Sequence, residues 1–228
     1  MRAARLVPAI LLFVSTALPA AAGSGDYATL TLSMTADAST KVATTESKSY
    51  NLLPGRPSWP TGPAVEYRIL NSPSAAAVEA AEATVDPYVT TRDFVRNDAT
   101  TQTNPCTGQP NTVQWAPIDG PNGFLAQTFL CINKAHEIVG FQTTFDTAET
   151  WATDGSPTAY DIQAVATHEF THIAGLDVVD KPADACLTMY FQTQPGETFQ
   201  RTLGLGDKIG LDRLYSTGNT SPGPGCGA

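Results

Sequence analysis

The chain has 228 residues, of which 42% are hydrophobic and 15% are charged, and its formal net charge is −9. This length and composition indicate a folded domain that can bury its own core, and they exclude a disordered chain. The acidic balance argues against nucleic acid and against anionic membranes as partners.

The first 22 residues have the pattern of a secretory signal peptide. Two arginines form a basic start, residues 6–18 form an apolar run, and residues 20–22, all alanine, offer a cleavage site. The apolar run is too short to span a bilayer, which disfavours the competing interpretation of a membrane anchor. We therefore expect a secreted protein, cleaved near Ala22. Loss of the two arginines changes the formal charge from −9 to −11.

Four cysteines remain after this cleavage: Cys106, Cys131, Cys186 and Cys226. An even number in an exported chain predicts two disulfides, for which three connectivities are possible. We expect the pairs Cys106–Cys131 and Cys186–Cys226, although the sequence alone leaves the connectivity open. No Cys-x-x-Cys pair occurs, so a cysteine-bound metal is not expected.

Residues 23–57 form an N-terminal extension or a propeptide. They are rich in Ala, Ser and Thr, and only residues 29–34 alternate apolar with polar side chains in the manner of a half-buried strand. Residues 51–63 contain four prolines and two glycines, which predict an irregular entry into the main domain. Whether the extension is removed by proteolysis stays open.

The main domain, residues 58–217, is expected to combine strands with helices. Alternating apolar side chains predict strands at residues 64–70, 112–116, 126–132 and 137–146. Helices are expected at residues 75–85, from 156–158 to 175, and at 206–215. Ser72 and Pro73 offer a cap and a first helical residue, and Gly175 ends the second helix because glycine adopts the left-handed conformation. Residues 218–228 form a C-terminal tail.

The second helix carries His168-Glu169-Phe170-Thr171-His172. Residues four apart share one helix face, so the two imidazoles can hold one zinc ion, and Glu169 is the candidate general base. The chain has only three histidines, and a chance match is expected in roughly a few chains per thousand. That rarity disfavours the alternative of two surface histidines on an ordinary helix. The third histidine, His136, is expected to be exposed or satisfied rather than a ligand.

Residues 168–177, His-Glu-Phe-Thr-His-Ile-Ala-Gly-Leu-Asp, followed by Met189-Tyr190, resemble the metzincin metallopeptidases, specifically bacterial members of the matrixin branch. The similarity extends over most of residues 58–216. It implies an α+β fold in which a twisted mixed sheet packs on an active-site helix and two further helices. It also implies that a peptide substrate lies antiparallel to an edge strand, here expected at residues 137–145, and that Met189 packs beneath the metal.

One residue departs from the family pattern at the metal. The family places its third zinc ligand ten residues after the first histidine, where this chain has Val178. Asp177 and Asp180 flank that position; closeness in sequence favours Asp177 and the facing of an extended chain favours Asp180. We predict that Asp177 completes the site with the two histidines. Structural calcium stays open, because acidic residues are present but an EF-hand loop is not.

The sequence thus predicts a secreted, monomeric zinc metalloendopeptidase that acts on a protein or peptide substrate. Zinc would activate a water molecule, and Glu169 would take its proton as the water attacks a carbonyl. The alternative is a non-catalytic secreted binding protein with the metzincin fold and an impaired zinc site, a hypothesis that Val178 keeps open. No cysteine precedes Cys106 in the sequence, so latency through a propeptide thiol is excluded.

Overall fold

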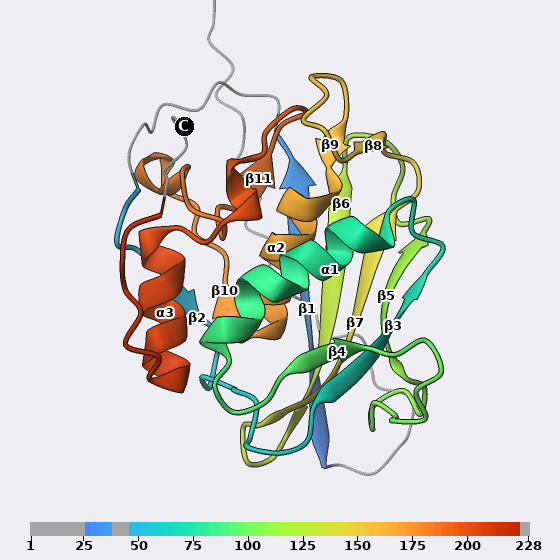
Figure 1. The fold of residues 1–228 in the computed structure, drawn as a ribbon, viewed down its shortest axis with the longest axis vertical. Coiled ribbons are helices and arrows are strands. Elements are labelled where there is room, and N and C mark those ends of the chain that lie inside the picture. The colour runs from blue at the N-terminus through green and yellow to red at the C-terminus, as the bar shows by residue number, and fades with distance from the viewer. Residues whose placement is uncertain (1–25, 38–45, 224–228) are drawn as a thin grey trace, which may run out of the picture.

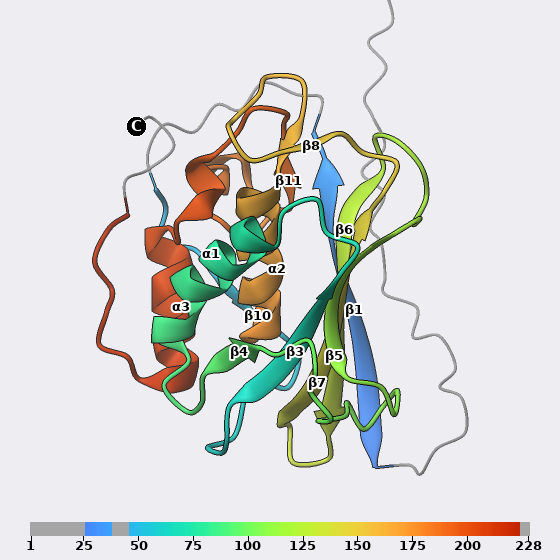
Figure 2. The ribbon, with the colours of Figure 1, turned by 45° about the vertical axis from the view of Figure 1, so that its right-hand side comes forward.

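The computed structural model describes residues 26–37 and 46–223. They form a seven-stranded mixed sheet with three α-helices on one of its sides (Figures 1 and 2). The strand order is β11-β1-β6-β7-β5-β3-β4. The α+β fold with a mixed sheet, predicted from the sequence, is confirmed.

Five long strands build most of the sheet: β1 (Tyr27–Ala36), β3 (Val65–Leu70), β5 (Asn111–Ala116), β6 (Phe124–Asn133) and β7 (Ile138–Asp146). Short strands add its two edges: β4 (Phe94–Arg96) and β11 (Gln192–Thr193). Two further pairs lie outside the sheet: β2 (Asn51–Leu52) with β10 (Leu176–Asp177), and β8 (Trp151–Ala152) with β9 (Tyr160–Asp161). Strands β4, β3, β5 and β7 run parallel, and β6 is antiparallel to both β7 and β1.

The three helices are α1 (Ala75–Val85), α2 (Ile162–Ile173) and α3 (Leu205–Tyr215). The predicted bounds of α1 are confirmed, but its cap is Ser74 rather than Ser72, since the Ser74 hydroxyl accepts a hydrogen bond from the Ala77 amide at 3.3 Å. The expected start of α2 at residues 156–158 is wrong. The helix begins later because the Asp161 carboxylate caps it, accepting from the Ala164 amide at 3.0 Å. Gly175, at φ +107°, ends it as predicted.

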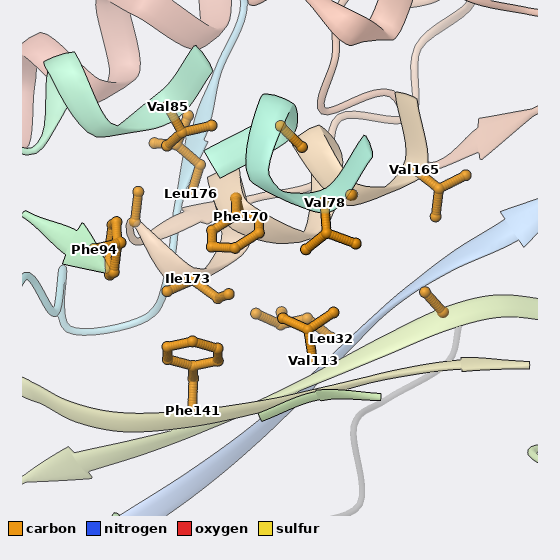
Figure 3. Packing of buried hydrophobic residues seen from close by; sticks show 14 of the residues in the cluster. Leu32, Val78, Val85, Phe94, Val113, Phe141, Val165, Phe170, Ile173 and Leu176 are labelled. Atoms are coloured by element: carbon orange, nitrogen blue, oxygen red, sulfur yellow. The ribbon is translucent and has the colours of Figure 1, made fainter. Parts of the chain in front are cut away.

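The hydrophobic core lies between the sheet and helices α1 and α2 (Figure 3). Phe170 of α2 packs edge-on against Tyr67 of β3, with ring centroids 5.6 Å apart, and against Phe94 of β4 at 6.1 Å. Leu32 and Met34 of β1 are buried in the same cluster. Because Phe170 lies between the two histidines of the motif in sequence, this packing fixes the rotation of α2 about its axis and turns the histidines away from the aromatic cluster.

The N-terminal extension contributes a strand to the main sheet. Strand β1 pairs antiparallel with β6 from Tyr27 opposite Asn133 to Thr35 opposite Phe124, and β11 pairs with its end. The strand predicted at residues 29–34 is therefore confirmed. The expectation that residues 137–145 form an edge is wrong, because β7 lies between β5 and β6 and is hydrogen-bonded on both sides.

The predicted disulfide Cys106–Cys131 is confirmed and ties the loop before β5 to β6. Cys186 is also disulfide-bonded, but its predicted partner Cys226 lies outside the described residues. The predicted signal peptide, residues 1–22, lies outside them as well. Within the described part of the chain, no helix has the length and apolar character needed to cross a membrane.

Candidate zinc and catalytic site

Helix α2 brings His168, Glu169 and His172 together in the interior. Each of the three has at most 1% of its surface exposed. The helix is anchored at its start by Asp161, which also pairs with Arg201 at 2.5 Å. A carboxylate at a helix N-terminus is favoured by the helix dipole, so this pair stabilises the helix from the end opposite to His172.

The hydrogen bonds of the two histidines determine which ring nitrogen carries the proton. Nδ1 of His168 lies 2.7 Å from the carbonyl oxygen of Thr188, and Nδ1 of His172 lies 2.8 Å from that of Leu176. A carbonyl oxygen can only accept, so both Nδ1 atoms donate and both Nε2 atoms are left with a lone pair. Burial lowers the pKa of His168 to about 4 and that of His172 well below its usual range, so both rings are neutral at pH 7.

This pair of imidazoles fits a zinc ion in chemistry and in spacing. Nε2 of His168 and Nε2 of His172 are 3.1 Å apart. Two imidazole nitrogens that bind one tetrahedral zinc ion, each at about 2.0–2.1 Å, lie about 3.3 Å apart. Two lone pairs directed at each other repel, whereas a shared cation makes the same arrangement favourable. Second hydrogen bonds from Nδ1 to carbonyl oxygens are the usual support for zinc-binding histidines.

The structure does not bring Asp177 together with the histidines. Among the residues that the structure describes, no group of three or more His, Cys, Asp or Glu side chains could hold a metal ion, zinc or calcium. Asp177 Oδ1 accepts instead from the amide of Val178 at 2.8 Å, Asp180 is exposed, and His136 is exposed in the turn between β6 and β7. The role of Asp177 as third ligand stays a prediction.

The loop that carries Asp177 is held by the N-terminal extension. Leu176 and Asp177 pair with Leu52 and Asn51 in the β10–β2 ladder. The Asn51 side chain also donates to the carbonyl oxygen of Val178 at 2.7 Å. Asp177 could approach the histidines only if these contacts rearranged.

Glu169 is held through one of its two oxygens. Oε2 accepts a 2.6 Å hydrogen bond from the hydroxyl of Thr128 on β6, whose oxygen lies 2.8 Å from that of Thr143 on β7. Oε1 is buried and has no hydrogen-bond partner among the described residues. Burial raises the pKa of Glu169 to about 8, against the opposing effect of the Thr128 hydrogen bond. One carboxylate oxygen is therefore fixed, and the other is free to exchange a proton or meet a ligand.

The turn at Met189 is held by a buried carboxylate of α3. Asp207 accepts hydrogen bonds from the amides of Thr188 at 2.8 Å, Met189 at 3.2 Å and Gly204 at 2.9 Å. The Thr188 carbonyl in turn accepts from His168. Met189 is buried, as the packing role implied by the family resemblance requires.

Sequence reasoning missed both Thr128 and Asp207. For Thr128 the only indication was a hydroxyl on the inward face of an apolar strand, and for Asp207 an acidic residue three positions after Gly204 at a helix start.

The His-Glu-x-x-His helix on a mixed sheet, ended by glycine and followed by a buried methionine turn, resembles the metzincin pattern except at Val178. The matrixin (Peptidase M10) family model matches residues 107–216, which span β5 to α3 and include the whole of this site. Over these residues, slightly under half of the chain, the protein is similar to the matrixins.

Curated relatives agree with this assignment. Human matrix metalloproteinase-25 is 36% identical over 109 residues, 46% of this chain and 18% of that protein. Human neutrophil collagenase is 28% identical over 194 residues, 78% of this chain and 39% of that protein. Metalloendoproteinase 4-MMP of Arabidopsis thaliana is 33% identical over 105 residues, 44% of this chain and 28% of that protein. The chain thus spans less than two thirds of the length of each of these relatives.

Proposed function

We propose that the protein is a zinc-dependent endopeptidase that is exported by a signal peptide at residues 1–22 and acts as a monomer on protein or peptide substrates. The observation that carries the proposal is the buried constellation on α2. Two neutral Nε2 atoms converge 3.1 Å apart, and Oε1 of Glu169 has no hydrogen-bond partner among the described residues. The match of residues 107–216 to the matrixin family model supports this interpretation.

In this proposal His168 and His172 hold zinc through Nε2, and Asp177 is the third ligand. The bound ion would supply an activated water molecule and polarise the substrate carbonyl. A cation held by the histidines would favour the ionised form of Glu169, which then accepts the proton of the attacking water and passes it to the leaving amine. Since Thr128 already donates to Oε2, Oε1 is the oxygen that receives this proton.

A second function is favoured by one specific observation. The family's third ligand position is Val178, and the described residues contain no complete metal-binding group. A secreted, non-catalytic binding protein would need neither a third zinc ligand nor a complete metal-binding group. It would keep the fold and lose the hydrolytic activity.

Metal content and hydrolysis together separate the two functions. The purified, exported protein is analysed for zinc and assayed on casein with and without a chelator. The peptidase proposal expects about one zinc per chain and hydrolysis that the chelator abolishes. A protein that retains zinc but cleaves no casein, even after the N-terminal strand is loosened as described below, would favour the non-catalytic function.

A further inference from the structure

The strand β1 lies directly beside the candidate base. Thr128 of β6 donates the hydrogen bond that holds Glu169, and Leu32 of β1 is the residue paired opposite Thr128. The other side of β6 is hydrogen-bonded to β7. An extended peptide that pairs with β6 next to Glu169 could therefore bind only on the side that β1 now occupies.

β1 fills that side of β6 as an added peptide would. It is extended, antiparallel and in continuous register with β6 from Tyr27 to Met34. Its ten residues carry no charge and alternate apolar with hydroxyl-bearing side chains over residues 30–33. Leu32 and Met34 point into the core, and Figure 3 shows Leu32 beside Val113 in the cluster under the helices. Extended peptides that add to a sheet edge use these same main-chain hydrogen bonds and alternate side-chain pockets.

The N-terminal extension also holds the loop that follows α2. Leu53 donates to the Gly175 carbonyl at 3.3 Å, and Asn51 donates to the Val178 carbonyl at 2.7 Å. Ser47 donates to Asp184 at 2.6 Å. The extension therefore contacts both the strand that fixes Glu169 and the loop that follows His172. In this conformation Glu169 is at most 1% exposed, so no substrate can reach it.

We propose that residues 27–36 are a built-in occupant of the peptide-binding edge of β6, and that an extended, uncharged peptide takes their place only after β1 leaves. The proposal rests on the proposed function for its consequence, an inactive closed form. Its structural part, the exchange of β1 for a peptide, can be tested without any hydrolysis.

The test uses the full-length protein with Leu32→Asp, and Ser33→Asp as the matched control. Leu32 is buried, whereas its neighbour Ser33 lies on the other face of β1 and is partly exposed. A carboxylate buried at position 32 penalises the seated strand, whereas the same carboxylate at position 33 remains hydrated. The probe is a fluorescent synthetic peptide with the sequence of residues 27–36. We expect Leu32→Asp to bind it roughly 10-fold or more tightly than the Ser33→Asp protein does.

A second variant covers the case in which Leu32→Asp fails to fold. Ser33 and Gln127 are directly opposite each other in the β1–β6 ladder. Residues so placed have Cβ atoms about 4.5–5.5 Å apart, close to the range that a disulfide bridges. The Ser33→Cys/Gln127→Cys protein should bind no peptide when oxidised and gain binding on reduction, compared with the unmodified protein under the same reductant.

The outcomes are distinguishable. A folded Leu32→Asp protein that binds no peptide and keeps its β6 amides as protected from hydrogen exchange as in Ser33→Asp would overturn the proposal. Peptide binding or casein hydrolysis by the oxidised Ser33→Cys/Gln127→Cys protein would overturn it as well. Peptide binding by Leu32→Asp without casein hydrolysis in zinc would support the strand exchange while contradicting the peptidase function.

Discussion

The helix α2 and the loop after it contribute to the same candidate site but are built differently. On the helix, each functional side chain is fixed by its own hydrogen bond: His168 to Thr188, His172 to Leu176 and Glu169 to Thr128. In the loop, the Asp177 carboxylate accepts a hydrogen bond from the next amide, and the backbone of Leu176 and Asp177 is paired with β2. The side chains on α2 are therefore preorganised for a metal, whereas the position of Asp177 depends on where the N-terminal extension lies.

The largest expected effect breaks the chemistry of the preorganised side chains. Glu169→Gln keeps the shape of the side chain and cannot act as a base, so casein hydrolysis should fall by a factor of roughly 10² to 10⁴. The assay is run in the Leu32→Asp background if that protein is the more active one. Zinc content should stay unchanged, because this carboxylate is not a ligand. Glu79→Gln, on α1 beside Arg96, is the control, and full activity of Glu169→Gln would rule out the mechanism.

A smaller effect concerns the support of His168. Burial raises the pKa of Asp207 from its usual value of 3.8 to about 6. The folded protein thus binds this proton more tightly than the unfolded chain, and the stabilising contribution is complete below pH 3.8 and is lost as the pH rises through 6. Between pH 4 and pH 7 the free energy of unfolding of the parent, relative to Asp207→Asn, should drop by roughly 2 kcal/mol.

Chemical denaturation of the metal-free proteins at several pH values measures this difference. The Asp207→Asn protein has no titrating group at this position. Its pH dependence therefore measures the contribution of all other ionisable groups, and subtracting it from that of the parent leaves the contribution of Asp207. A difference between the two proteins that is flat with pH would show that Asp207 is not held in a raised-pKa state, and that the Met189 turn is supported in another way.

The smallest effect probes the loop. Removal of the predicted third ligand by Asp177→Ala should weaken zinc binding by roughly 10-fold or more, and Asp180→Ala should leave it unchanged. Val178→His places an imidazole at the family position and should tighten binding. If Asp180→Ala weakens binding instead, the ligand is Asp180. If neither alanine variant changes the zinc affinity, the carboxylate hypothesis is wrong and the non-catalytic function becomes the better one.

The sequence predicted well those parts of the molecule that rest on local periodicity. The helix at residues 75–85 and the long strands have apolar patterns that a single segment displays, and the His-Glu-x-x-His spacing needs only one helix to be meaningful. Two-residue strands such as β2 and β10 contain no period to detect. Their pairing, between residues far apart in the chain, exists only in the folded protein.

Long-range order was the harder part. That β7 lies inside the sheet, with β6, β1 and β11 beyond it, depends on sheet order, which alternation along one strand does not encode. Thr128 and Asp207 act on α2 from other elements, so their roles follow from contacts across the fold. The later start of α2 has a local cause, the capping by Asp161. The sequence also offers a Ser-Pro pair at residues 156–157, and that pair led to the earlier predicted start.

The most direct test of the central claim is a zinc titration of the metal-free, full-length protein by calorimetry, with His172→Ala and His136→Ala beside it. His172 belongs to the converging pair, and His136 is exposed in the turn between β6 and β7. The account predicts one zinc per chain in the parent and in His136→Ala, and an affinity weaker by about 100-fold or more in His172→Ala. Zinc binding that is absent from the parent, or equal in all three proteins, would contradict the claim that α2 carries a preformed metal site.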